Sequence, residues 1–299
     1  MSVSIKNIAQ GNLFRYAWWS LCRKQKEMKQ RAAHVDAMNQ MAKHLGMINT
    51  HYLNPQGLVE NGAYCMTTAR DLCLLANAAL QNKKLRSFYA KEYEITRHVP
   101  TVLCMETIRK KKIVAKIAES EINGHPILIE KTGGGDTHYA LLMAVDIDGT
   151  TVCGAIMEAK DEDHRYPAMC ELMTGVEQIL KGKKLKNDCV ESAKTGCAYV
   201  VEKDGTLRCV YEQKPDDVYP TMSTAKMMTV YIAIDGLNES EYTPITPYDV
   251  EGTGIGDFLY RWDKISIQDL IYLCLLPSCC VAANAIARIN GKRILNSQR

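Results

Sequence analysis

Two Asp-Gly pairs, each set between apolar runs, constrain the fold of this chain more than any other feature. Residues 139–158 read YALLMAVDIDGTTVCGAIME and turn at Asp148-Gly149, and residues 196–213 read GCAYVVEKDGTLRCVYEQ and turn at Asp204-Gly205. Asp-Gly readily adopts the positive φ angles of a two-residue hairpin turn. Both segments therefore predict antiparallel strand pairs.

Helical patterns surround these hairpins. Thr67 or Thr68 is suited to capping the N-terminus of the helix expected at 69–82, and Gly46 is suited to ending the helix expected at 13–45. The expected helices cover residues 13–45, 69–82, 164–181 and 227–237, together with parts of 262–290. Separate helices around an antiparallel sheet indicate an α+β fold.

Composition excludes several classes of protein. The chain has 299 residues, of which 46% are hydrophobic and 24% charged, as in globular proteins, and its net charge of +3 does not indicate a nucleic-acid partner. The basic runs at 109–112 and 181–186 are interpreted as solvated surface. The longest apolar runs fall short of the ~18 residues of a membrane span, and LFRYAWWSLC lacks a signal-peptide cleavage site.

Twelve cysteines are many for this length. They lack the paired CxxC spacing of zinc sites, and several lie inside apolar runs such as DLCLLA. We expect them to be small buried residues in a reducing or anaerobic setting. The cellular location stays open.

The segment PTMSTAK at 220–226 has the composition of a serine nucleophile site. Three residues are almost one helical turn, so the amine of Lys226 is expected beside the hydroxyl of Ser223. A neighbouring base is what a serine needs to become a nucleophile, and a helix start offers free N–H groups to an oxyanion.

Lys131-Thr132-Gly133 follows an apolar segment and offers a cation, a hydroxyl and a residue that permits close approach of a substrate backbone. A second Lys-Thr-Gly occurs at 194–196, before the second hairpin, and is given no role. Ser278, in LLPSCC at a helix entry, is a candidate proton relay.

These elements together resemble the penicillin-recognising serine enzymes, and in particular the low-molecular-weight D-alanyl-D-alanine carboxypeptidases. The similarity extends to VDAMNQMAKHLGMINTHYLNPQGL, ENGAYCMTTARDLCLLANAAL, VYPTMSTAKMMTVYIAI and ISIQDLIYLCLLPS, and covers most of residues 34–299. It implies a β-lactamase/transpeptidase-like fold, with an antiparallel sheet flanked by helices and an all-helical subdomain.

The order of the elements differs from that family, in which SxxK and SxN precede KTG. Here KTG comes first, which predicts a circular permutation, tolerable where the old termini lie close together. The expected parts are an extension at 1–33, the KTG half at 34–181, a junction at 182–192 and the SxxK half at 193–299.

The resemblance implies a D-Ala-D-Ala carboxypeptidase without a cofactor, acting on peptidoglycan stem peptides and acylated by β-lactams. Ser223, Lys226 and Ser278 would be catalytic. The substrate would be bound by Lys131, Thr132, Gly133 and Gly134. Cys280 stands where the family has the asparagine of SxN, which puts substrate positioning in question.

Alternatives are a catalytically weak or inactive penicillin-binding relic, which Cys280 and the missing signal sequence favour, and a swapped oligomer in which half-domains pair between chains. The family is extracytoplasmic, whereas no signal sequence is visible. The N-terminal helix could also lie on an anionic membrane, although packing over the protein is the preferred interpretation. Its relevant side chains are Trp18, Trp19, Arg23, Lys24, Lys26, Lys29 and Arg31.

Overall fold

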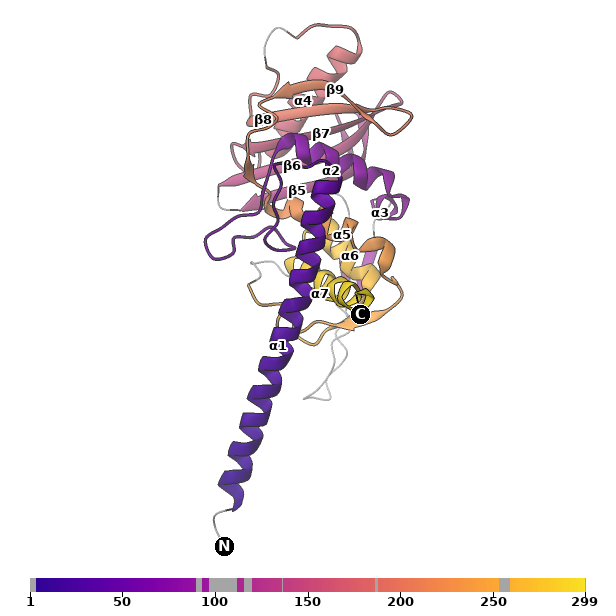
Figure 1. The fold of residues 1–299 in the computed structure, drawn as a ribbon. Helices are drawn as coiled ribbons and strands as arrows, with labels where there is room; N and C mark the ends of the chain where they lie inside the picture. Colours follow the sequence, from indigo (N-terminus) through magenta and orange to yellow (C-terminus); the bar gives the residue numbers. More distant parts are fainter. Residues whose placement is uncertain are drawn as a thin grey trace.

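A computed structural model describes residues 4–89, 93–96, 112–115, 120–135, 137–185, 188–252 and 259–298. Its centre is a six-stranded antiparallel sheet in the order β4-β5-β6-β7-β8-β9 (Figure 1). The strands are β4 (Glu121–Ile122), β5 (His125–Gly135), β6 (His138–Ile147), β7 (Thr150–Ala159), β8 (Ala193–Val201) and β9 (Leu207–Gln213). The expected α+β class is confirmed.

Both expected hairpins are present. Strands β6 and β7 pair up to Ile147 and Thr150, and the turn residues Asp148 and Gly149 have φ angles of 50° and 83°. Strands β8 and β9 pair as far as Val201 opposite Leu207. The positive φ angles explain why Asp-Gly closes the first turn.

Helices cover both faces of the sheet. Helix α2 (Ala69–Gln81) packs against β6, β7 and β8 on one face, followed by α3 (Lys83–Ser87), and α4 (Arg165–Leu180) packs on the other (Figure 1). Thr68 is the cap of α2, because its side chain accepts a hydrogen bond of 3.1 Å from the backbone of Asp71. Each helix buries apolar side chains from one set of alternating strand residues.

A helical layer lies below the sheet in Figure 1. It contains α5 (Ala225–Tyr231), α6 (Ile267–Leu275) and α7 (Cys280–Ser297), and the 3-10 turn η1 (Met222–Thr224) leads into α5. The prediction of a helix at 227–237 was wrong at its C-terminal end. Helix α5 ends at Tyr231, and a separate 3-10 turn, η2 (Ile234–Gly236), follows. Three two-stranded sheets complete the fold: β1 (Met66–Thr67) with β10 (Tyr219–Pro220), β2 (Tyr93–Thr96) with β3 (Lys112–Ala115), and β11 (Tyr242–Pro244) with β12 (Lys264–Ser266).

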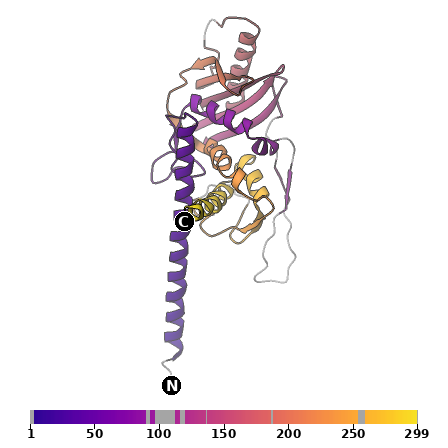
Figure 2. The same ribbon diagram turned by 45° about the vertical axis from the view of Figure 1, so that its right-hand side comes forward.

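The first helix, α1 (Ser4–His44), starts earlier than expected and ends where Gly46 takes a positive φ of 79°. It runs past the helical layer, and its N-terminal part extends beyond the rest of the molecule (Figures 1 and 2). Its C-terminal part crosses α7 very closely, since a Cβ on Gly291 would lie 1.7 Å from the carbonyl oxygen of Gln30. Only glycine permits this crossing.

The segment between α4 and β8 is held to the sheet side of the molecule. Glu171 on α4 accepts hydrogen bonds from the backbone of Glu191 (2.7 Å) and of Ser192 (2.9 Å). Partial burial acts to raise the pKa of Glu171, but hydrogen bonds from the side chain and backbone of Ser192 and from the backbone of Glu191 outweigh it, so the pKa is lowered.

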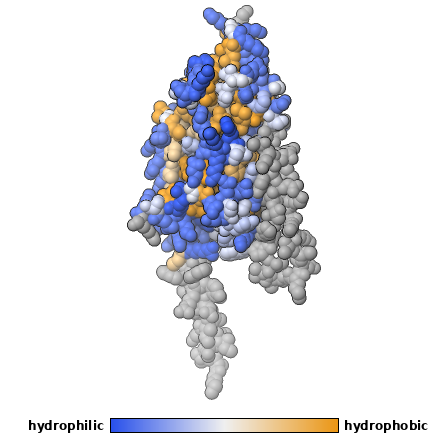
Figure 3. Space-filling model, turned by 90° about the vertical axis from the view of Figure 1, so that its right-hand side faces the viewer, coloured by the Kyte–Doolittle hydropathy of each residue, from blue (hydrophilic) through white to orange (hydrophobic). Residues whose placement is uncertain are grey.

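Cysteines are largely internal, as expected. Within the described residues all of them are free thiols, and the buried ones are Cys65, Cys73, Cys153, Cys197, Cys274 and Cys279. Cys104 lies outside the described residues. No described helix has the length and apolarity to cross a membrane. The side view in Figure 3 shows a mostly hydrophilic surface interrupted by smaller hydrophobic areas.

Candidate active site

Ser223 lies on η1, immediately before α5. The Nζ atom of Lys226 donates a hydrogen bond of 2.7 Å to the Oγ atom of Ser223, and the Lys226 side chain is fully buried. The i, i+3 spacing brings the two side chains to the same side of the turn. Met222, just before the serine, has a positive φ of 47°, so the backbone bends sharply at this point.

The strand β5 brings Lys131, Thr132 and Gly133 against this bend. A Cβ on Gly133 would lie 2.9 Å from the carbonyl oxygen of Thr221. A backbone carbonyl cannot easily move aside, so a side chain at this position would push the strand away from the nucleophile turn. Glycine therefore sets the distance between the two walls of the site.

Two lysines share the interior of the site. Lys131 is 1% exposed, and its Nζ donates to the backbone oxygen of Thr132 at 3.1 Å. Burial, and then the positive charge of Lys226, lower the pKa of Lys131 to about 7. Cys274 is near both amines, but burial raises its pKa to about 12, so at neutral pH it is an uncharged thiol and neutralises neither lysine.

A pocket of about 530 Å³ opens in front of these groups. Five of the eight residues singled out from the sequence line it, namely Thr132, Gly134, Ser223, Ser278 and Cys280. The other three, Lys131, Gly133 and Lys226, belong to the two walls described above. The structure thus brings the candidate residues together, while their chemical roles stay predictions.

Ser278 lies between α6 and α7, with a positive φ of 62°. Its Oγ atom is buried and has no hydrogen-bond partner among the described residues. A buried hydroxyl without a partner is costly, and it is available to a group that enters the pocket.

Arg165, Glu162 and Tyr139 also line the pocket and were not foreseen from the sequence. Arg165 donates to the carbonyl oxygen of Gly133 at 3.3 Å and to Glu162 at 2.6 Å, and its side chain is 12% exposed. The hairpin pattern holds the signal that was missed: β6 runs away from the KTG end of β5 and β7 returns to it, so residues after 159 arrive beside the site.

The second Lys-Thr-Gly lies on β8 and contributes nothing to this pocket. Lys194 is paired with Glu158 at 3.2 Å and lies over the ring of Tyr219. This ion pair joins β8 to its neighbour β7.

Residues 30–161 match the model of a family described as D-alanyl-D-alanine carboxypeptidase. The match covers less than half of the chain and includes Lys131, Thr132 and Gly133, whereas Ser223 and Ser278 lie outside it. No curated protein and no solved structure matches the chain. With the resemblance of its sequence elements, this match identifies residues 30–161 as part of the penicillin-recognising serine D-alanyl-D-alanine carboxypeptidase family.

Proposed function

We propose that this protein is a serine hydrolase that releases the terminal D-alanine of peptidoglycan-type peptides through an acyl-enzyme, and that β-lactams acylate the same serine. The observation that carries the proposal is the 2.7 Å contact between Lys226 Nζ and Ser223 Oγ, in a pocket bordered by Thr132 and Gly134. A buried amine in contact with a serine hydroxyl is an arrangement that activates the nucleophile.

In the proposed acylation, Ser223 Oγ attacks the carbonyl carbon of the penultimate D-alanine, and Lys226, as the general base, takes up the proton of the hydroxyl. Ser278 then delivers the proton to the nitrogen of the leaving D-alanine, and the C–N bond breaks. The unpartnered Oγ of Ser278 supports this relay. Water later attacks the ester, releases the shortened peptide and restores Ser223.

The backbone N–H groups of Ser223 and Gly134 are proposed to stabilise the oxyanion. Lys131 and Thr132, with Arg165 beside them, would bind the terminal carboxylate of the substrate. The pKa of Lys131, lowered to about 7 by burial, gives this site a specific property. An arriving carboxylate favours the protonated amine, so binding would take up a proton near neutral pH.

The circular permutation is part of the proposal. Helix α1 contains VDAMNQMAKH, the segment expected to follow the SxN element. It packs against α7, which begins at the last residue of Ser278-Cys279-Cys280, although α1 comes first in this chain. Strand β8 pairs with β7 and follows α4 after a connection held by Glu171. Both observations support a single domain cut after α7 and rejoined at about residues 182–192.

The alternatives have less support. One chain supplies both walls of the pocket, so a swapped oligomer is not needed to complete the site. An inactive relic would be favoured only by Cys280 and the unseen signal sequence. The family match to a carboxypeptidase favours hydrolysis.

Intact-protein mass spectrometry with a penicillin tests the proposal. We expect one covalent adduct on the full chain and none on Ser223→Ala. A D-alanine release assay on a pentapeptide ending in D-Ala-D-Ala then separates a working hydrolase from a relic. Absence of any adduct at millimolar drug contradicts the proposal, and an adduct without D-alanine release supports the relic.

Cys280→Asn restores the amide that the family places at this position. If the missing hydrogen bond limits the reaction, acylation should be faster by severalfold, equivalent to about 1 kcal/mol. Cys280→Ser is the matched control, since it lacks the amide. An unchanged or lower rate in Cys280→Asn would mean that the pocket is adapted to cysteine.

A further inference from the structure

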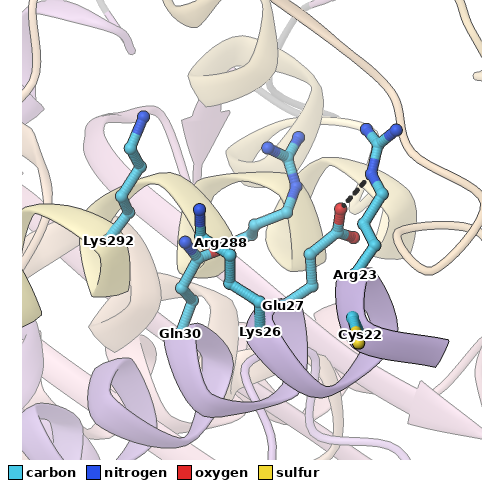
Figure 4. A pocket seen from close by; sticks show the side chains of 7 residues that line it. All are labelled: Cys22, Arg23, Lys26, Glu27, Gln30, Arg288 and Lys292. Carbon is cyan, nitrogen blue, oxygen red and sulfur yellow. Dashed lines mark hydrogen bonds and ion pairs between the residues drawn. The ribbon is translucent and has the colours of Figure 1, made fainter. Parts of the chain in front are cut away.

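A second groove lies where α1 crosses α7 (Figure 4). Its volume is about 430 Å³, and it shares no lining residue with the pocket of Ser223. Among the residues that the structure describes, the side chains that line it come from these two helices: Cys22, Arg23, Lys26, Glu27, Gln30, Arg288 and Lys292.

The charges in this groove do not balance. Arg23 is paired with Glu27 at 3.0 Å, and Arg288 with the fully buried Asp249 at 2.9 Å. Lys26 and Lys292 are different, because neither has an ion pair or a hydrogen bond to any residue that the structure describes. Two paired arginines and two unpaired ammonium groups leave the groove positively charged.

Gln30 provides a second, independent observation. It is 6% exposed and lines the groove, yet its side-chain amide has no hydrogen-bond partner within the described part of the chain. Figure 4 shows the Gln30 amide on the same side of α1 as Lys26. Because this side chain lines the groove and makes no described hydrogen bond, its N–H groups are available to a ligand oxygen.

The groove also continues along the helices. An adjoining hollow of about 360 Å³ shares Cys22, Lys26, Gln30 and Lys292 with it and adds Lys29, which has no described ion pair either. A ligand that fits both hollows would carry negative charge at more than one place along its length.

We propose that the α1–α7 groove is a binding site for phosphate groups, with Lys26, Lys292 and the Gln30 amide as donors and with room for a second phosphate beside Lys29. A phosphate group carries close to two negative charges and three acceptor oxygens, which matches two ammonium groups and one amide. This site is separate from the proposed acylation chemistry and does not depend on it.

The phosphate could belong to a soluble compound or to a lipid headgroup. The contacts of α1 favour a soluble source, because part of its basic surface is already used within the protein. Lys24 is paired with Glu251 at 3.0 Å, and Arg31 donates to the backbone oxygen of Tyr248. Both side chains contact the segment around residue 250, so they are not free to contact a lipid surface.

Isothermal titration of the full chain with pyrophosphate and with inorganic phosphate tests the proposal. Lys26→Gln/Lys292→Gln should bind pyrophosphate about tenfold more weakly than wild type, as loss of two exposed charge contacts predicts. Lys43→Gln/Lys203→Gln removes the same charge from exposed positions outside the groove and is the matched control. Gln30→Leu should weaken binding severalfold, while the backbone of residue 30 keeps its contact with Gly291.

A parallel arm measures co-sedimentation with phosphatidylglycerol vesicles. Vesicle binding that requires Lys26 and Lys292, together with weak pyrophosphate binding, supports the phosphate site and assigns it to a lipid headgroup. Pyrophosphate binding without vesicle binding supports it with a soluble ligand. Equal binding by the groove variant and the charge-matched control, or binding to neither ligand, overturns the proposal, whatever the result of β-lactam labelling at Ser223.

Discussion

The same tripeptide, Lys-Thr-Gly, occurs twice in the central sheet, on β5 and on β8. The two lysines differ completely: Lys131 is 1% exposed beside a second buried amine, whereas the Lys194 side chain is 63% exposed and paired with Glu158. What differs is the neighbour of each strand. The β5 segment meets the turn that carries Ser223, whereas the β8 segment pairs its lysine with Glu158, a nearly buried carboxylate of the neighbouring strand β7.

The comparison teaches that a tripeptide acquires chemistry from what the fold places against it. Both glycines are tightly packed, but Gly133 faces a backbone carbonyl and Gly196 faces the side chain of Val190, where a Cβ would lie 3.0 Å away. Both threonines have limited exposure, but Thr132 lines the pocket and the hydroxyl of Thr195 is buried without a described partner. Paired substitutions can therefore separate site from scaffold.

Replacing the lysines should give the largest contrast. Lys131→Met should lower the rate of β-lactam acylation by about a hundred- to a thousandfold, because the ligand carboxylate loses a buried cation. Lys194→Met should acylate like wild type. Stopped-flow acylation with a chromogenic cephalosporin measures both. Similar losses in the two variants would mean that the β5 lysine has no special role.

The glycines should differ nearly as much. Gly133→Ala displaces β5 from the carbonyl of Thr221 and should slow acylation about a hundredfold, since small misplacements of reacting groups have effects of this size. Gly196→Ala meets a side chain that can rotate, so its acylation rate should stay within twofold of wild type. The same assay checks both variants, and an unimpaired Gly133→Ala would show that the two walls can separate without loss of function.

Lys131 should also make stability depend on pH. Its pKa is about 7 in the folded protein and is expected near 10.4 in the unfolded chain, so between these values the unfolded state binds more protons and stability rises with pH. Lys131→Met lacks this cost. Its advantage in unfolding free energy over wild type should therefore shrink by about 2 kcal/mol from pH 7 to pH 8.5.

Urea unfolding of both proteins at several pH values measures that difference. Thiols of the unfolded chain also titrate near the upper end of this window, whereas burial raises the pKa of Cys153 and Cys274 to about 12 in the folded protein. These thiols are common to both proteins and cancel in the comparison. Lys194→Met is the control and should keep the wild-type pH profile. A constant difference between Lys131→Met and wild type would mean that Lys131 stays protonated throughout.

The threonines should show the smallest effect. Thr195→Val removes a buried hydroxyl without a described partner and should raise unfolding free energy by up to about 1 kcal/mol, or a few degrees in the thermal midpoint. Thr132→Val should give no such gain and should weaken acylation. Thermal unfolding measures the first effect. A loss of stability in Thr195→Val would reveal a partner for its hydroxyl.

Much of this arrangement was predictable from the sequence, because its signals are local. Asp148-Gly149 fixes a hairpin, and Ser223 and Lys226 are one turn apart, so neither requires knowledge of distant contacts. The length of the helix after Lys226 was not predictable in the same way. Apolar residues continue past Tyr231 to Ile234, and Asp235 and Gly236 follow, but α5 already ends at Tyr231. The sequence offers no breaker there, and the packing of the fold decides.

Arg165 is a pocket residue that was not predicted from the sequence, because its contact is not local. Its contact with Gly133 spans 32 positions and depends on the return of β7 to the KTG end of the sheet. The groove between α1 and α7 joins positions even farther apart. No local pattern in the sequence relates Lys26 to Lys292. The crossing that brings them together depends on Gly291, which lacks a side chain and so lets the carbonyl group of Gln30 pack closely against it.

The crossing of α1 and α7 has a consequence for synthesis on the ribosome. His34 and Asn290 meet at 3.1 Å, both fully buried, although 256 positions separate them. At 5–20 residues per second, α1 would wait roughly 10–50 s for the helix that covers it. During that time its core-facing side, including a histidine whose pKa burial lowers to about 3, is open to water and to other chains. We therefore expect a nascent chain stalled before residue 280 to be bound by chaperones, and to be released once α7 has emerged.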